Sequence, residues 1–240
     1  MTTQPPTTPP TPTGILLIDK EPGYTSMDVC AIIRSRLRKG GAPKRIKVGH
    51  GGTLDPLATG LLVVLVGKAT PLCNQIMAGE KEYLATIDLS RTSDTDDEEG
   101  PTHPATITTP PTREQLLAAL ATLTGNIQQR PPAFSAIKSG GRRAYDIARA
   151  GGEIELPARP VTVHALDLVD YTFPACALRI RCGKGTYIRS IARDMGPLLH
   201  TGGMLTSLIR TAVGRWHLQH ARQLADLPDV LTQAHLLPVD

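Results

Sequence analysis

Several common kinds of functional site are missing from this sequence of 240 residues. Its four cysteines form no CxxC pair and have no histidine partners at the spacing of a zinc site. The apolar run Leu61–Val66 is far too short to span a bilayer. The start, residues 1–13, has neither the basic region nor the apolar core of a signal peptide. We therefore expect no metal site, no membrane association and a cytoplasmic protein whose thiols are free in a reducing compartment.

Nucleotide-binding motifs are also missing. A P-loop needs a lysine and a hydroxyl residue after its glycines, so that both reach the phosphates and Mg²⁺. The glycine-rich segment Val48–Gly60, VGHGGTLDPLATG, has no lysine, and the GKGT that begins at Gly183 has Leu178 where the first glycine is required. No dinucleotide fingerprint is present. We expect no nucleotide cofactor, and the rival hypothesis of an NTPase can be tested by nucleotide binding.

Acidic residues are missing from a long part of the chain, since Asp55 is the only one between Asp28 and Glu80. The net charge is only +4, yet basic residues gather in three separate stretches. These are Arg34–Lys47, Arg130–Arg149 and Arg179–Arg193. Such stretches favour a polyanionic partner, and nucleic acid before membrane, because no basic amphipathic helix with a broad apolar face is present. The simpler alternative is that they are solvated surfaces.

Apolar periodicity and turn signals predict a mixed-sheet α/β or α+β enzyme fold without internal repeats. Strands are expected at residues 14–20, 60–67, 83–89 and 176–182. Helices are expected after Thr25 and Thr112, each of which has a partner at capping-box spacing, and over residues 186–196. The Pro- and Thr-rich residues 1–13 have too few apolar side chains to order, so we expect a disordered tail.

Asp55 can be interpreted in two ways. Asp followed by Pro56 is an ordinary turn opening, because proline presets φ and the carboxylate can bind backbone amides. The loop is otherwise nearly devoid of polar side chains, and its glycines would let another molecule approach the backbone closely. A lone carboxylate in a basic neighbourhood would stay ionised and could act as a nucleophile or base.

The segment VGHGGTLDPLATGLLVV resembles the central motif of the TruB family of bacterial tRNA pseudouridine synthases. Further motifs of that family occur in the same order, and the likeness extends from Gly14 to Arg215. They are GILLIDKEPGYTS, KEYLATIDL, TSDTDDEEG, QQRPPAFSAIKSGGRRAYDIARAG and GKGTYIRSIARDMG. The resemblance implies an α+β pseudouridine synthase fold, with a mixed, mostly antiparallel central sheet flanked by helices and loops.

The resemblance also implies three catalytic residues. Asp55 matches the catalytic carboxylate, and Arg189 matches the arginine that pairs with it. Tyr83 matches the tyrosine that stacks on the target base and is discussed as a participant in proton transfer. The alternatives are that Arg189 forms a helix-surface row with Arg193 and that Tyr83 is a core aromatic.

Five further residues match positions that bind the RNA in the family. His50 would fill the space left by the flipped nucleotide, Tyr187 and Leu208 would line the active site, and Asp97 would engage the RNA loop. Lys20 would contact the substrate or support the Asp55 segment. Each also has a structural explanation: a loop hydrogen bond for His50, packing for Tyr187 and Leu208, and a solvated acidic run for Asp97.

The resemblance predicts that the chain isomerises uridine 55 in the T-loop of tRNA after base flipping, without a cofactor. The expected partner is the tRNA T-stem-loop, bound by a monomer. The catalytic domain would cover residues 14–215, with an RNA-gripping insertion near 125–160, and residues 216–240 would not form a full PUA-type RNA-binding domain. Departures from the family pattern are Pro71 in place of a lysine and Ser93 in place of a threonine. The alternative function is an RNA-binding or tRNA-folding module in which catalysis is secondary.

Overall fold

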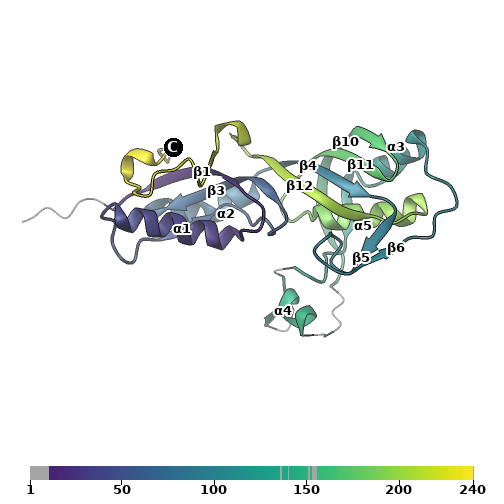
Figure 1. Ribbon diagram of the computed structural model, residues 1–240, viewed down its shortest axis with the longest axis horizontal. Coiled ribbons are helices and arrows are strands. Elements are labelled where there is room, and N and C mark those ends of the chain that lie inside the picture. Colours follow the sequence, from purple (N-terminus) through teal and green to yellow (C-terminus); the bar gives the residue numbers. More distant parts are fainter. Residues whose placement is uncertain (1–10, 136, 140, 151, 153–155, 240) are drawn as a thin grey trace, which may run out of the picture. The chain divides into compact units, whose positions relative to one another are not determined.

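The computed structural model describes residues 11–135, 137–139, 141–150, 152 and 156–239 (Figure 1). The chain forms two compact units, one made of residues 1–77 and 216–240 and the other of residues 78–215. Helices and antiparallel strands occur in both units, which confirms the expected α+β class. The second unit ends at Arg215, where the expected catalytic region ends, whereas the division after Met77 was not expected from the sequence.

The first unit is a small sheet covered by one long helix. Within it the strand order is β14, β1, β3, and β2 pairs with β3 as well. The strands are β1 (Gly14–Lys20), β2 (Val48–His50), β3 (Thr59–Val66), β13 (Trp216–His217) and β14 (Arg222–Gln223). The helices are α1 (Ser26–Lys39), η1 (Gly67–Leu72), α2 (Cys73–Ala78), η2 (Leu218–His220) and η3 (Gln233–His235). The expected strands at residues 14–20 and 60–67 correspond to β1 and β3.

Helix α1 begins at the expected capping box. The Thr25 side chain accepts from the backbone of Asp28, and the Asp28 carboxylate accepts from the backbone of Thr25. One face of α1 is buried with residues of β1, β3 and the C-terminal segment. That cluster includes Ile18, Val29, Ile33, Leu37, Leu62, Val64 and Leu231. The cluster accounts for one face of β3, that of Leu62, Val64 and Val66, and the residues of the other face are buried as well.

The second unit contains a larger antiparallel sheet with the strand order β12, β4, β11, β10, β7. Its strands are β4 (Lys81–Asp88), β5 (Arg91–Ser93), β6 (Thr102–Pro104), β7 (Gly125–Gln129), β8 (Lys138–Ser139), β9 (Arg142–Arg143), β10 (Arg159–Thr172), β11 (Ala175–Cys182) and β12 (Met204–Val213). Its helices are α3 (Arg113–Thr122), α4 (Ala144–Arg149) and α5 (Ile188–Leu199). Strands β4 and β11 and the box-capped α3 were expected, whereas β10 and β12 were not.

Helix α5 contacts both β12 and α3, so most of its surface is inside the second unit (Figure 1). The sequence predicted an end at Gly196, but the helix continues through Pro197 to Leu199 and ends at His200 in the left-handed region. Arg189 lies in the first turn of α5 and is buried. The sequence alternative that Arg189 forms an exposed row with Arg193 is therefore wrong for Arg189.

The other expectations about chain organisation concern the termini and the insertion. Residues 1–10 of the expected tail lie outside the described residues, whereas the Thr13 backbone is bound at both polar atoms by the Gln233 side chain. The expected insertion runs from β7 to β10 and contains β8, β9 and α4. No helix among the described residues is long and apolar enough to cross a membrane.

Candidate active site

The segment that carries Asp55, residues 51–58, connects β2 to β3 in the first unit, and we call it the Asp55 loop. Gly51 N donates to Val63 O at 2.8 Å as the chain leaves β2. Ala58 N donates to Asp55 O at 3.1 Å, which closes the turn expected at Asp55 and Pro56. The Asp55 side chain is half-buried. The turn and the candidate carboxylate are therefore the same feature.

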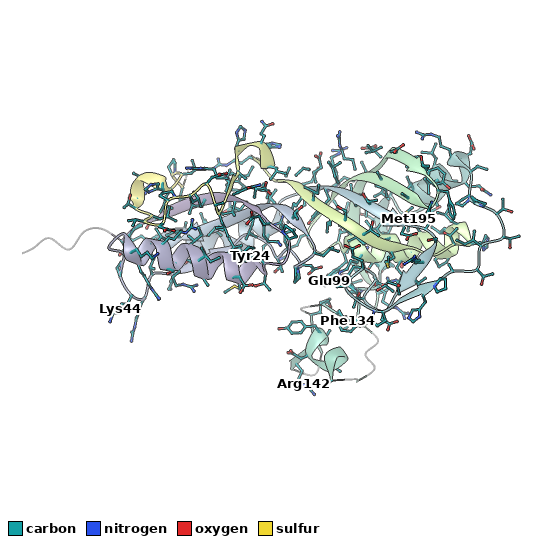
Figure 2. All side chains as sticks on the ribbon, viewed as in Figure 1. Tyr24, Lys44, Glu99, Phe134, Arg142 and Met195 are labelled. Atoms are coloured by element: carbon teal, nitrogen blue, oxygen red, sulfur yellow. The ribbon has the colours of Figure 1, made fainter. Side chains whose placement is uncertain are left out.

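Lys20 holds this turn by hydrogen bonds from its buried side chain to backbone carbonyls. Its side chain is 0% exposed, and its Nζ donates to Tyr24 O at 2.8 Å, Glu21 O at 2.9 Å and Pro56 O at 3.3 Å (Tyr24 is labelled in Figure 2). Pro56 O also accepts from Gly23 N at 3.0 Å. Of the two roles expected for Lys20, these contacts favour support of the loop, and contact with substrate stays a prediction.

The N-terminus of α1 provides a second attachment. Buried Ser26 accepts from Leu54 N at 2.8 Å through its Oγ and donates to Leu54 O at 3.1 Å. Both hydrogen bonds end on the residue before Asp55. Since Ser26 is the first residue of a packed helix, the position of the carboxylate is tied to rigid structure.

The glycines and His50 of the same segment pack within the first unit. A Cβ on Gly51 would lie 2.3 Å from Cγ2 of Ile76, and Gly52 has a φ of 139°. The need for glycine at 51 therefore comes from the protein's own core rather than from approach of another molecule. His50 is half-buried on β2, and its carbonyl accepts from Cys73 Sγ at 3.2 Å.

The second unit holds Arg189 in a dense set of contacts. Its side chain is 7% exposed, and Nη1 lies 3.2 Å from Oδ2 of Asp97. Nη1 also donates to Thr95 O at 3.0 Å, and Nη2 donates to Phe134 O at 2.9 Å (Phe134 is labelled in Figure 2). The guanidinium is thereby oriented by two backbone carbonyls and one carboxylate. The expected pairing of Arg189 with Asp55, which belongs to the other unit, stays a prediction.

The acidic run is not a uniformly solvated loop, contrary to that alternative. Asp97 is 1% exposed and accepts from Thr95 Oγ1 and, at 3.1 Å, from Glu99 N. Asp96 has a φ of 62° and lies 2.9 Å from Nη1 of Arg193. Burial raises the pKa of the Asp96 carboxyl, and Arg193 acts in the opposite direction. A direct contact of Asp97 with RNA stays a prediction, and its observed partner is Arg189.

Tyr187 is held by a residue that the sequence did not single out. Buried Gln129 accepts from Tyr187 N at 2.8 Å and donates to Tyr187 O at 3.0 Å. The Arg159 guanidinium lies 5.3 Å from the centre of the Tyr187 ring, within cation–π distance. The ring is half-buried at the start of α5. No simple motif would have identified Gln129, because its partner is 58 residues away.

Tyr83 and Leu208 lie in neighbouring strands of the same sheet. Tyr83 of β4 is opposite Ile180 of β11 on one side and Arg210 of β12 on the other, and Leu208 is opposite Ala85. Both Tyr83 and Leu208 are buried, as their structural alternatives also require. The roles of both in base binding stay predictions.

Buried positive charge near Tyr83 was also missed. Lys81 lies two residues along β4, and burial lowers its pKa to about 8, helped by the neighbouring charge of Arg210. Arg210 itself is fully enclosed. Both cations stand on the buried side of the sheet with Tyr83.

The chain matches a family model described as "TruB family pseudouridylate synthase (N terminal domain)" over residues 39–188. It is 40% identical over 222 residues to tRNA pseudouridine synthase B of Phocaeicola vulgatus, covering 92% of this chain and 94% of the relative. It is 43% identical over 220 residues to the protein of the same name from Corynebacterium glutamicum strain R, covering 90% and 72%.

Two solved structures have a similar fold. A chain in an H/ACA ribonucleoprotein bound to a substrate RNA containing 2′-deoxyuridine is 25% identical, with a TM-score of 0.65. A chain in a Cbf5–Nop10–Gar1 complex is 27% identical, with a TM-score of 0.66. The match covers 89% of this chain in both cases, but only 52% and 53% of those longer chains.

Proposed function

This chain belongs to the TruB family of pseudouridylate synthases, and we propose that it isomerises uridine 55 in the T-loop of tRNA with Asp55 as the catalytic carboxylate. The coarser function is that of an RNA pseudouridine synthase that acts on tRNA. The observation that carries the finer proposal is the Asp55 turn. It lies inside the range of the family match and is fixed from two sides, by Lys20 and by Ser26.

The reaction breaks the bond between the sugar and a ring nitrogen of uracil and rejoins the sugar to a ring carbon. Because the product is an isomer of the substrate, no net oxidation or reduction is needed, and we propose catalysis without a cofactor or metal. A carboxylate can attack the base, attack the sugar or remove a sugar proton. Each role needs an ionised oxygen held in one direction, and the turn at Asp55 supplies that fixed direction.

We assign Arg189 to the same reaction as the cation that orients Asp55. Its guanidinium has the required properties, since it is buried and oriented by Thr95 O and Phe134 O. Asp97 fixes the position of Arg189, and in the same proposal it engages the RNA loop. A buried, hydrogen-bonded arginine orients a carboxylate more strictly than an exposed one, because little freedom is left in the side chain.

The remaining site residues are assigned to the substrate. A uridine in folded RNA must leave its stack before it can react, at a cost of a few kcal/mol. In our proposal His50 fills the vacated space, Tyr83 stacks on the flipped uracil, and Tyr187 and Leu208 complete the pocket. Lys20 acts on the substrate indirectly, because its hydrogen bond to Pro56 O holds the turn that carries Asp55.

The partner in this proposal is the T-stem-loop of tRNA, bound by a monomer in the cytoplasm. The insertion between residues 125 and 160 contributes phosphate contacts through its basic residues. Because such contacts depend on charge, the affinity should fall steeply as salt concentration rises.

The direct test is incubation of the protein with an unmodified tRNA transcript, followed by mapping of every pseudouridine. The expected result is a single pseudouridine at position 55. A transcript with cytidine at that position is the matched control and should yield none. Pseudouridine at a different position would refute the assigned substrate, and no pseudouridine at all would favour the tRNA-folding function over catalysis.

A further inference from the structure

A group of exposed positive charges lies at the C-terminal end of α1, in the first unit. It comprises Arg38, Lys39, Lys44, Arg45 and Lys47, which we call the α1 basic loop. Lys44 extends away from the helix at the tip of this loop (Figure 2). In the part of the chain that the structure describes, none of the five is ion-paired with a carboxylate. Near this end of α1, Asp229 lies 3.8 Å from Nε of Arg36, which is not one of the five.

The backbone of this loop is held in place by several contacts. Ala42 N donates to Leu37 O at 3.0 Å, and Ile46 N donates to Pro43 O at 2.9 Å. The Arg38 side chain donates to Lys44 O. Ile46 is buried in the core of the first unit, whereas its neighbours in the sequence, Arg45 and Lys47, are exposed. The charges are therefore held on an ordered backbone, which reduces the ordering cost of binding an anion.

The helix dipole explains only part of this charge. Cations in the last turn of α1 are stabilised by the negative end of the dipole, and this accounts for Arg38 and Lys39. It does not account for Lys44, Arg45 and Lys47, which lie beyond the helix. Five like charges, none of them ion-paired with a carboxylate among the described residues, repel one another, and a polyanion removes that repulsion.

Helix α1 fixes the distance between the Asp55 loop and the helix end of this loop, whereas Lys47 at the other end is followed by β2, which leads into the Asp55 loop at Gly51. Ser26, the first residue of α1, is hydrogen-bonded to Leu54, next to Asp55. Helix α1 is 14 residues long, and the basic loop begins at its other end. At about 1.5 Å per residue, the two ends are about 20 Å apart. Both loops belong to the first unit, so this spacing is built into one rigid element.

We propose that the α1 basic loop binds backbone phosphates of the tRNA substrate several base pairs away from the nucleotide that reacts. The inference rests on the proposed function, since Asp55 defines where that nucleotide lies. Lysine and arginine on an exposed loop contact phosphates without regard to sequence, which suits a segment that must accept many tRNA species. The loop thus recognises the length and position of a duplex, and the active site recognises the uridine.

The test compares two variants that each lose two positive charges. The first is Lys44→Gln/Arg45→Gln, and the matched control is Lys68→Gln/Arg113→Gln, which removes exposed charges elsewhere. Binding of whole tRNA is measured between about 50 and 200 mM salt. In the first variant the slope of log affinity against log salt should fall by about 2, with affinity about tenfold lower at low salt. A slope equal to that of the control would refute the proposal.

A second comparison tests the distance. Pseudouridine formation is measured on whole tRNA and on a T-loop hairpin whose stem is cut to three base pairs, about 10 Å at 3.4 Å per pair. The ratio of activity on whole tRNA to activity on the hairpin should fall about tenfold in the first variant only. An equal loss on both substrates would place the contact at the reacting loop and refute the proposal. If the wild type forms no pseudouridine but the slopes still differ, the proposed function fails and the phosphate contact stands.

Discussion

Lys20 and Ser26 hold the Asp55 loop through its backbone, whereas the loop that carries Asp97 is held by charged side chains in addition to backbone hydrogen bonds with Leu205. Lys20 and Ser26 bind carbonyl and amide groups on either side of Asp55. Asp97 is instead enclosed, and its own carboxylate meets Arg189 and Thr95. The two aspartates thus have different surroundings, since Asp55 is half-buried and Asp97 is enclosed.

The difference indicates a division of labour. A carboxylate that does chemistry must meet the substrate, so its loop has to be fixed without covering the side chain. A carboxylate that positions another group can be buried, because its partner is the protein itself. The comparison therefore predicts that changes at Asp55 affect turnover and changes around Asp97 affect stability as well.

The largest effect on turnover is expected for Asp55→Asn. The amide keeps the shape of the side chain but cannot carry the negative charge, so the rate should fall by about 1,000-fold or more. The affinity for tRNA and the thermal midpoint should stay close to those of the wild type. Single-turnover formation of pseudouridine on a tRNA transcript measures the rate, and a rate within tenfold of the wild type would remove Asp55 from the catalytic role.

The largest effect on stability is expected for Arg189→Met. Removal of the guanidinium leaves Asp97 buried without its cation, which should cost about 3–5 kcal/mol of unfolding free energy. The double variant Arg189→Met/Asp97→Asn should recover part of this loss, because the buried charge is gone. Urea unfolding of the single and double variants measures the coupling. A loss below about 1 kcal/mol in the single variant would mean that Asp97 is not confined as the structure indicates.

Local sequence signals predicted several of the helices and strands that surround the two loops. The capping boxes at Thr25 and Thr112 marked the starts of α1 and α3, because donor and acceptor are three residues apart in the chain. The apolar run at residues 60–67 and the alternation at residues 176–182 predicted strands for the same reason. In each case the interaction that decides the structure lies within a few residues.

Strands β10 and β12 were missed because their alternation is interrupted. β12 has register shifts between Leu205 and Ser207 and between Arg210 and Ala212, and β10 also has two. Each shift changes which face the following side chains occupy, so a period of two is not visible in the sequence. Pairing with distant strands compensates for the weak local pattern.

The candidate site was predictable as a set of residues but not as a set of contacts. Family motifs pointed to Asp97 and Arg189, while the acidic run suggested a solvated loop. Burial of Asp97 depends on an arginine supplied by a helix that is far away in sequence. Gln129, which holds the backbone of Tyr187, belongs to no pattern of charge or periodicity. Contacts of this kind follow from the tertiary fold alone.

A smaller effect is expected for Ser26→Ala, which tests how the Asp55 loop is held. Loss of the hydroxyl leaves Leu54 N without its buried acceptor, at a cost of about 1–3 kcal/mol. The rate should fall about tenfold as Asp55 becomes less well placed. Ser35→Ala, at an exposed position of the same helix, is the matched control. If both variants turn over tRNA at the wild-type rate, the link between α1 and the loop has no role in catalysis.

The smallest effect is expected for Asp96, in the loop that carries Asp97, where the free energy of unfolding should depend on pH. Burial raises the pKa of Asp96 above its ordinary value of 3.8, so the folded protein holds that proton more tightly than the unfolded chain. Stability from this group is complete below pH 3.8 and is lost as the pH rises through the higher folded value. Asp96→Asn removes the titration, so its unfolding free energy should fall less than that of the wild type as the pH rises above 4. Asp194, whose pKa is also raised by burial, keeps its own contribution in both proteins. Parallel curves of unfolding free energy against pH would show that Asp96 ionises in the folded protein as it does in water.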